Sequence, residues 1–376
     1  MQYREFGKTG VKVSPIGFGM MRLPSDNEGN VNEAEAIRIV REAIDNGLNY
    51  VDTAFNYHGG NSEKITGKAL LDGYRDKVYL ATKAPVWMFK GPEDFDSILE
   101  KQLSRLQTDH IDMYLLHSLN AISFEKKVFR YGVLDKIKAA RDAGKIKYIG
   151  FSFHDKLDVF KKICDSFDWD FCQIQLNYID WTFQDAKAKV DLLNELNIPI
   201  WVMEPLRGGK LASLSDENTE KLKALRPNEN IPSWAFRFLQ SIPGVTVVLS
   251  GMSNLDQLKD NVRTYEENKP LNDAEFKAIT DIAGGMLKAN TLPCTACRYC
   301  TSHCPKGIDI PRILELYNEH SFTGGGFIAP MAIAALPADK QPSACIACRS
   351  CEAVCPQQIK ISEAMAEFSK KLGLKK

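Results

Sequence analysis

The sequence predicts a (β/α)8 TIM barrel over residues 1–285, followed by a small, mainly helical domain over residues 286–376. Short apolar runs alternate with helical patterns eight times within about 250 residues, the number and length typical of this barrel. The runs are almost continuously apolar, as expected for parallel strands that are covered on both faces. Eight of the ten cysteines lie after residue 290, so the composition changes near the predicted boundary.

The predicted barrel strands are short, and several of them end at a polar or small residue. They are Ile16–Gly19, Asn49–Asp52, Val78–Lys83, Ile111–Leu116, Ile146–Phe151, Phe171–Leu176, Pro199–Glu204 and Val245–Ser250. The segments between them read as amphipathic helices. The helix after the first strand begins at Asn32, with Glu35 three residues on, a start typical of a capping box.

Two features outside the strands complete the fold prediction. Residues 3–14, YREFGKTGVKVS, hold two short alternating runs around a Gly-Lys-Thr-Gly turn, and we expect a hairpin that plugs the bottom of the barrel. Gly284 and Gly285 are expected to end a helix near the domain boundary. An open doubly wound sheet is the alternative, but it is weakened because no GxGxxG follows the first strand.

Chemically active side chains stand where three predicted strands end. Asp52, Lys83 and His117 end the second, third and fourth strands, and Tyr57 follows in the stretch VDTAFNYHGG. Strand ends of this kind meet at one face of the barrel. A lysine that ends a buried run is costly unless it is paired, and Asp52 is its natural partner.

A positive charge beside Tyr57 is expected to lower the pKa of the phenol. A tyrosine tuned in this way acts as a general acid toward a carbonyl oxygen, and His117 would orient the carbonyl or share the proton. Each residue alone has a structural explanation: Asp52 as a turn residue, Lys83 as a side chain reaching solvent, His117 as a buried structural histidine. Their combination favours catalysis.

The stretches YVDTAFNYH, ATK, YLLH and IGFSFHD make the chain resemble the aldo-keto reductases over roughly residues 1–270. That family is a (β/α)8 barrel that moves a hydride between a nicotinamide and a carbonyl. The resemblance implies a catalytic tetrad of Asp52, Tyr57, Lys83 and His117. It also implies nicotinamide contacts from Ser152 and Gln173.

The resemblance further places the adenosine end of the cofactor on residues 250–261, SGMSNLDQLKDN, with Asp260 and Asn261 as contacts. Gly251 and Gln257 stand where the family often has the Lys and Arg that grip a 2′-phosphate. Without those two cations we expect a weaker preference for NADPH, and NADH or another redox partner stays open.

Two further positions depart from the family pattern. Phe153 stands where an Asn commonly follows the serine. Met203 aligns with an aromatic residue that often stacks on the nicotinamide.

The C-terminal cysteines form two copies of one motif, CTACRYCTSHCP and CIACRSCEAVCP. The spacing C-x2-C-x2-C-x3-C-P is typical of bacterial [4Fe–4S] binding, in which the fourth cysteine serves the other cluster. One cluster is therefore expected on Cys294, Cys297, Cys300 and Cys355, and the other on Cys345, Cys348, Cys351 and Cys304.

Zinc and disulfides are the competing explanations of these cysteines. Zinc motifs rarely add a third cysteine and a Cys-Pro, and disulfides are disfavoured in a cytosolic chain. Expected helices at residues 311–319 and after Ile361 favour a helical arrangement, and the region resembles a two-cluster ferredoxin domain.

The charge balance limits the classes of partner. Lys+Arg and Asp+Glu both number 48, which argues against nucleic-acid binding and against a polybasic membrane surface. The N-terminus lacks the apolar run of a signal peptide, and no apolar stretch is long enough for a membrane span. We expect a cytoplasmic protein with a small-molecule carbonyl or alcohol substrate.

The sequence therefore predicts an NAD(P)H-dependent oxidoreductase that reduces a carbonyl, or oxidises an alcohol, with electron transfer through two [4Fe–4S] clusters. The alternative is a ferredoxin-type module that docks a redox partner such as a ferredoxin, with the barrel as a scaffold or as a flavin or nicotinamide site. A hydride carries two electrons and each cluster takes one, so a bridging flavin stays open, since TIM barrels can hold a flavin phosphate without an obvious sequence signature.

Overall fold

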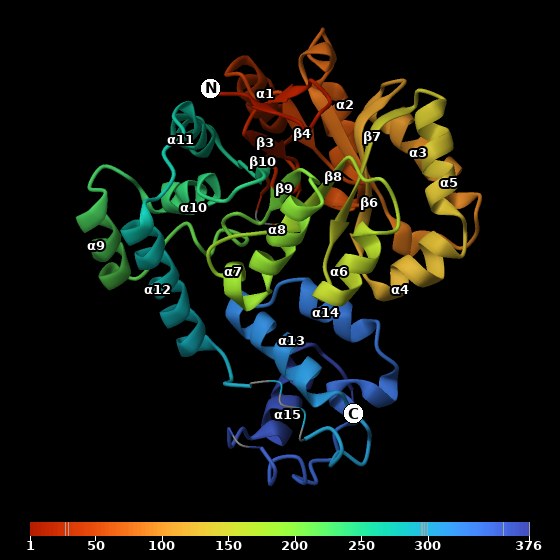
Figure 1. Ribbon diagram of the computed structural model, residues 1–376. Helices are drawn as coiled ribbons and strands as arrows, with labels where there is room; N and C mark the ends of the chain where they lie inside the picture. Colours follow the sequence, from red (N-terminus) through yellow and green to blue (C-terminus); the bar gives the residue numbers. More distant parts are fainter. Residues whose placement is uncertain are drawn as a thin grey trace. The chain divides into compact units, whose positions relative to one another are not determined.

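The computed structural model describes residues 1–26, 28, 30–294, 296, 298, 300–355 and 357–375. The chain divides into two compact units, Met1–Ile279 and Thr280–Lys376, and each is described by itself (Figure 1). In the part of the chain that is described, no helix has the length and apolar character that a membrane span requires.

The first unit is a closed barrel of eight parallel strands in the order β10-β3-β4-β5-β6-β7-β8-β9. The strands are β3 (Ile16–Gly19), β4 (Tyr50–Asp52), β5 (Tyr79–Ala84), β6 (Ile111–Leu119), β7 (Ile146–Phe153), β8 (Phe171–Gln175), β9 (Ile200–Met203) and β10 (Val245–Ser250). All eight predicted strands are present, with ends shifted by up to three residues. The predicted (β/α)8 fold is confirmed.

Helices surround the barrel (Figure 1). They are α1 (Glu33–Asp45), α2 (Asn61–Ala69), α3 (Asp94–Leu106), α4 (Ala121–Ser123), α5 (Val133–Asp142), α6 (Leu157–Cys164), α7 (Asp180–Phe183), α8 (Ala186–Glu195), α9 (Asp216–Leu225), α10 (Ile231–Gln240) and α11 (Leu255–Glu266). Short 3-10 segments cover Tyr57–Gly60, Arg75–Lys77 and Val86–Met88, and a π-helical segment covers Phe124–Phe129. As predicted, Asn32 caps α1, because its Oδ1 accepts the backbone N–H of Glu35 at 3.1 Å.

The predicted N-terminal hairpin is also present, as β1 (Arg4–Glu5) paired antiparallel with β2 (Lys12–Val13). Phe6 leaves β1 fully buried, and its ring packs edge-on against Tyr148, Phe171 and Trp201 at 4.9–5.9 Å. These three rings belong to the first residues of β7, β8 and β9, so Phe6 fills the end of the barrel opposite the strand ends that carry Asp52 and Lys83.

The second unit is helical, and its described residues include no β-strand. Its elements are α13 (Ile310–Thr323), α14 (Ile328–Ala334), α15 (Ile361–Lys371) and the 3-10 segments Ala338–Lys340 and Pro342–Ala344. Apolar side chains of all three helices share one core with two cysteines, Cys300 and Cys351. The sequence had indicated two of these helices, α13 and α15.

The connection into this unit differs from the prediction. Gly284 and Gly285 do not end a helix, because α12 (Asp273–Asn290) continues through both of them. A glycine costs an exposed helix about 1 kcal/mol relative to alanine, which neighbouring helix formers offset.

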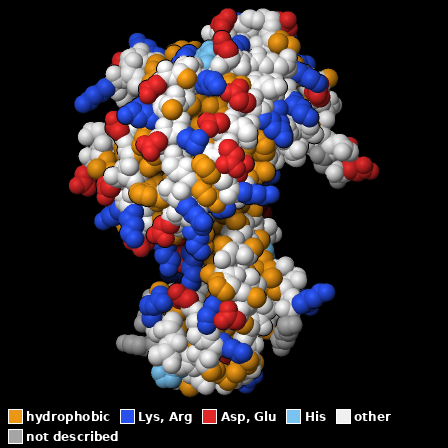
Figure 2. All heavy atoms as spheres, turned by 90° about the vertical axis from the view of Figure 1, so that its right-hand side faces the viewer, with side chains coloured by type: hydrophobic (Ala, Val, Ile, Leu, Met, Phe, Trp, Pro, Cys, Tyr) orange, Lys and Arg blue, Asp and Glu red, His pale blue; other side chains and the backbone are white. Residues whose placement is uncertain are grey.

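The face in Figure 2 shows acidic and basic side chains interspersed over the surface.

Candidate functional site

Lys83 connects two of the other predicted tetrad residues. Its Nζ lies 2.5 Å from Oδ1 of Asp52 and donates at 3.5 Å to the Tyr57 hydroxyl. It also donates to the backbone carbonyl of Thr53 at 2.8 Å. The ammonium therefore has carboxylate, phenol and carbonyl partners, which a buried charge requires.

The strands bring these groups together because neighbouring strands end at the same rim. Asp52 pairs in register with Ala81, and Lys83 lies two residues further along β5. Both side chains are buried, at 2% and 1% exposure. The chain after Tyr57 turns sharply, with His58 in the left-handed region at φ 50°. Such a conformation is uncommon outside glycine and is often found at functional sites.

The charge of Lys83 is stabilised in place. Although burial disfavours the ammonium, the adjacent Asp52 carboxylate and Tyr57 hold the pKa of Lys83 above its ordinary value. Burial raises the pKa of Tyr57, and Lys83 only partly opposes this effect. The prediction that the Tyr57 pKa falls is therefore wrong: loss of water around the phenol outweighs the nearby positive charge.

His117 lies beside Tyr57. The two ring centroids are 6.0 Å apart in an edge-to-face arrangement, and the Trp87 ring lies 5.0 Å from the imidazole on another side. Burial, with Lys83 and His154 adding to it, lowers the pKa of His117 well below its ordinary value. At neutral pH the imidazole is therefore uncharged. Its buried Nδ1 has no hydrogen-bond partner in the described part of the chain.

A cavity of about 400 Å³ opens beside the tetrad. Its lining includes six of the predicted site residues, namely Asp52, Tyr57, Gly251, Gln257, Asp260 and Asn261. Asn261 is buried and donates to the Ser250 hydroxyl at 3.0 Å. Met203, at the predicted stacking position, also lines the cavity. Residues far apart in the sequence thus share one pocket.

Ser152 and Gln173 do not line this cavity, although they pair with each other across β7 and β8. Gln173 donates to Oδ2 of Asp52 at 3.4 Å, and the Ser152 hydroxyl accepts the backbone N–H of Ser118 at 2.7 Å. Phe153 points the other way along β7, where its ring packs on Phe160 at 4.8 Å. Gln173 therefore supports the tetrad through Asp52, and Ser152 lies beside Gln173 on the neighbouring strand.

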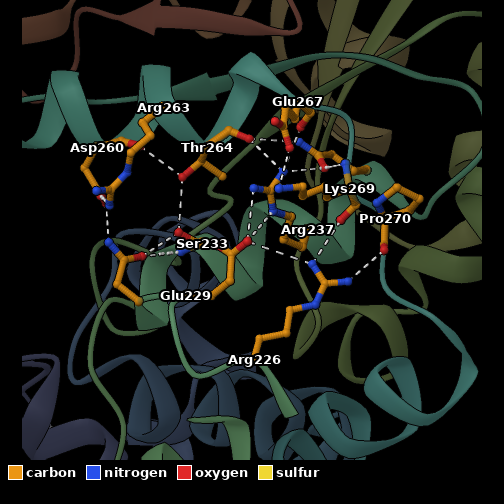
Figure 3. A network of polar contacts seen from close by, with 12 residues as sticks. Arg226, Glu229, Ser233, Arg237, Asp260, Arg263, Thr264, Glu267, Lys269 and Pro270 are labelled. Carbon is orange, nitrogen blue, oxygen red and sulfur yellow. Dashed lines mark hydrogen bonds and ion pairs between the residues drawn. The ribbon is translucent and has the colours of Figure 1, made fainter.

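Asp260 is part of a polar network that joins α10 and α11 (Figure 3). Its carboxylate accepts from Asn230 at 2.6 Å and from Arg263 at 2.5 Å. In the same network, buried Arg237 binds Glu229 and the carbonyl of Thr264. Because Arg263 pairs with Asp260, part of the negative charge of this carboxylate is offset.

Among the charged residues that line the cavity, two were missed by the sequence analysis, Arg22 and Glu204. Arg22 lies against Gly251, where an added Cβ would approach the Arg22 Cβ to 2.6 Å, so only glycine leaves it this space. Glu204 follows β9 with φ 57°, and burial raises its pKa. The sequence held a clue to both residues. Arg22 closely follows the predicted strand Ile16–Gly19, and Glu204 directly follows β9.

The cysteines of the second unit line two separate cavities. One is lined by Cys304, Cys345, Cys348 and Cys351. The other is lined by Cys294, Cys300 and Cys355, and Cys297, predicted for this set, lies outside the described residues. In the part of the chain that is described, no three His, Cys, Asp or Glu side chains are placed to hold a single metal ion.

The two cysteine loops have matching backbone conformations at two pairs of described positions. Ala296 and Arg298 in the first loop have φ of 52° and 64°, and Ala347 and Arg349 in the second have 56° and 61°. Alternating left-handed residues turn backbone N–H groups toward one side, a conformation that binds anions such as iron–sulfur clusters. Thiolate donors around each cavity suit such a cluster, so the residues fit the group.

Comparison with known proteins assigns both parts of the chain. Residues 15–283 match the aldo/keto reductase family, and residues 293–360 match a 4Fe-4S dicluster domain. The chain is 26% identical to the uncharacterized oxidoreductase YqkF of Bacillus subtilis, covering 74% of this chain and 95% of that protein. It is 29% identical to L-galactose dehydrogenase of Arabidopsis thaliana, covering 72% and 90%.

Solved structures agree with this assignment. The holo form of aldo-keto reductase AKR11C1 from Bacillus halodurans is 27% identical, with a TM-score of 0.62 over 75% of this chain and 96% of that one. An aldo/keto reductase from Klebsiella pneumoniae, solved with NADP and acetate, has a similar fold at 20% identity and a TM-score of 0.61, covering 74% and 94%. This chain therefore belongs to the aldo/keto reductase family and carries a 4Fe-4S dicluster domain after the barrel.

Proposed function

We propose that the protein is an NAD(P)H-dependent oxidoreductase that reduces a carbonyl group, or oxidises an alcohol in reverse, with Tyr57 as the proton donor. One observation carries the proposal: Lys83 binds both Asp52 and Tyr57 at the edge of a cavity of about 400 Å³. A phenol beside a buried ammonium is suited to lose and regain a proton. A position in an open cavity makes that proton available to a substrate.

The cavity is lined by one cation, Arg22, and by three acidic residues, Asp52, Glu204 and Asp260, so we infer that an anionic cofactor binds on its Arg22 side. Gly251, Gln257 and Asn261 line one part of it, and Arg22 is the only Lys or Arg among the lining residues that the structure describes. A nicotinamide dinucleotide bound there supplies the hydride. The protein's part is to hold the dinucleotide by its phosphates and to keep the reacting carbonyl beside Tyr57.

The tetrad residues carry out the proton transfer. Because its pKa is raised, Tyr57 keeps its proton at neutral pH and donates it to the carbonyl oxygen. Lys83 stabilises the phenolate that is left, since its own pKa is raised and it stays charged. Neutral His117 donates a hydrogen bond to the same oxygen and fixes its position.

The second unit would hold two [4Fe–4S] clusters, which supply one-electron transfer when bound. We assign Cys304, Cys345, Cys348 and Cys351 to one cluster, since these four line one cavity. Cys294, Cys300 and Cys355 line the other, and Cys297 is assigned with them from the motif spacing. The boundary between the two domains is proposed near residue 285.

The test is carbonyl reduction by the Tyr57→Phe protein with NADH and with NADPH. We expect kcat to fall by about 10²–10⁴-fold with little change in KM for the dinucleotide, because the ring remains and only the hydroxyl that carries the donated proton is lost. The control is an unchanged iron and sulfide content. Equal rates for the two proteins would remove Tyr57 from the mechanism.

The pH profile of the normal protein sharpens this test. Reduction requires a protonated phenol, so its rate should stay level through neutral pH and fall only above the ordinary tyrosine pKa of about 10. His117 is neutral at and above pH 6.5, because its pKa is lowered, so no inflection is expected near that value. A rate that declines between pH 7 and 8 contradicts the assignment.

A further inference from the structure

We propose that an acidic one-electron carrier protein of the ferredoxin class docks on the second unit, beside the cavity lined by Cys304, Cys345, Cys348 and Cys351. The docking surface is the basic rim of this cavity, formed by Lys306 and Arg349 around the apolar side chain of Ile346. This inference rests on the proposed clusters and adds which of the two sites receives electrons and what charge its partner has.

The first observation is charge. Lys306 and Arg349 both line this cavity and are exposed. Neither side chain forms an ion pair or a hydrogen bond with any described residue. Two carboxylates lie nearby: Asp339 pairs with Lys340 at 3.5 Å, and Glu352, which accepts from Ser362 at 2.8 Å, interacts electrostatically with Arg349. Lys306 therefore presents its positive charge to a partner, whereas Glu352 offsets part of the charge of Arg349.

The second observation is access. Cys348 is exposed, and residues 346–350 of the same loop are all exposed as well. Ile346, between two of the cysteines, has 57% of its surface exposed. An apolar centre with a charged border is the usual composition of a protein interface. A partner seated on Ile346 would lie directly against the site that these cysteines form.

The other cysteine cavity lacks these features among its described residues. Its single cation, Arg298, is paired with Asp309 at 3.1 Å. None of its described cysteines is exposed, and Cys300 is buried. At the two pairs of positions for which φ is given in both loops, Ala296/Ala347 and Arg298/Arg349, the angles agree, so the difference at these positions lies in the side chains. This asymmetry selects the Cys345–Cys351 loop as the docking side.

Charge complementarity then determines the partner. A basic rim steers a negatively charged protein into contact and speeds its association, an effect that salt weakens. In each encounter the carrier would lose one electron, and a cluster held by these cysteines would gain it. No proton or covalent bond is transferred, so the carrier is the only co-reactant required.

The experiment uses the complete protein with its clusters and a purified acidic bacterial ferredoxin as the probe. Binding is measured calorimetrically at about 20 mM and about 300 mM salt, and electron transfer from the reduced ferredoxin is followed by stopped flow. We expect Lys306→Glu to weaken binding by about fivefold to tenfold at low salt and to slow electron transfer in proportion.

Lys370→Glu is the matched control. It makes the same charge change on an exposed residue of α15, about 13 Å along the helix from Ile361, which lines the cavity. At low salt its binding should fall much less than that of Lys306→Glu, and at about 300 mM salt it should equal that of the normal protein. Equal binding by both variants, or binding that does not respond to salt, overturns the proposal.

Two further results have separate meanings. A protein that lacks iron contradicts the proposed clusters rather than the rim. A Lys306→Glu protein with full iron and normal ferredoxin binding, but with slower reduction of its clusters by NAD(P)H, would show that the rim serves the chain itself and would overturn the proposed partner.

Discussion

The barrel site and the cysteine cavities are assembled in opposite ways. In the barrel, Lys83 binds Asp52 from 31 positions away and Gln173 reaches Asp52 from 121 positions away. In the second unit, three cysteines of each set come from one stretch of seven residues. The barrel site is thus held by long-range protein contacts, whereas each cavity is made by a short loop and one cysteine of the other motif.

This difference separates a site that exists before its ligand from one that depends on it. The Asp52–Lys83 pair has protein partners for its charge and is buried among strands. By contrast, Cys300 and Cys351 belong to the core of the helical unit, beside cavities that a bound cluster would fill. We therefore expect the two units to respond differently to the loss of what they bind.

Removal of iron from the complete protein with a chelator under oxidising conditions should have the largest effect. Cluster binding contributes directly to folding when a small unit is organised around it. Backbone amides of α13 and α15 should lose at least about tenfold in protection from hydrogen exchange, while those of β4, β5 and β6 keep theirs. Mass spectrometry of peptides from the iron-free and iron-loaded forms measures both regions in one sample.

Reconstitution with iron and sulfide is the control, and it should restore the protection. If the backbone amides of α13 and α15 are equally protected from hydrogen exchange without iron, the apolar core of the helical unit is sufficient to hold these helices in place. The contrast between the two units would then lose its physical basis.

Replacement of Lys83 by methionine tests the barrel side of the comparison. The change leaves the buried Asp52 carboxylate without its cation, which costs about 3–5 kcal/mol when one partner of a buried pair is removed. Urea unfolding monitored by barrel fluorescence gives the loss in free energy. Carbonyl reduction should be lost as well, because no ammonium is left to stabilise the phenolate.

The same substitution at Lys187 is the matched control. Lys187 pairs with Asp191 on the surface with more than half of its side chain exposed, and such pairs contribute little to stability. A double Asp52→Asn, Lys83→Met protein should regain much of the lost stability, since no charge remains buried. If the Lys83→Met and Lys187→Met proteins unfold at the same urea concentration, the Asp52–Lys83 pair does not stabilise the end of the barrel that carries the tetrad.

The sequence predicted the parts of both sites that depend on local pattern. Eight apolar runs located the strands, and the ends of the second and third runs carried the residues that meet as Asp52 and Lys83. The cysteine spacing predicted which side chains line each cavity, apart from Cys297. These features could be read because strand ends in a barrel share one rim and motif spacing is local.

What the sequence could not provide depends on tertiary burial. The direction of the Tyr57 pKa was wrong because the sequence shows a neighbouring charge but not the loss of water that outweighs it. Arg22 was missed because its place over Gly251 requires β3 and β10 to be neighbours. The difference between the two cysteine rims was also hidden, since Arg298 and Arg349 occupy the same motif position and, among the described residues, only Arg298 forms a salt bridge.

Replacement of Arg22 by glutamine should have the smallest effect and tests how complete the barrel site is before its ligand binds. The stem of Arg22 passes over Gly251 and its Nη2 reaches toward Gly208, and both glycines line the cavity. We propose that this guanidinium binds the pyrophosphate common to both dinucleotides. We expect KM for NADH and NADPH to rise together by about fivefold, the loss of one exposed phosphate contact. The control Arg38→Gln, at an exposed position of α1, should change neither KM.

A rise in KM for NADPH alone would place Arg22 at the 2′-phosphate, where it would replace the cations absent at Gly251 and Gln257. No rise for either would mean that the barrel binds its cofactor without this arginine.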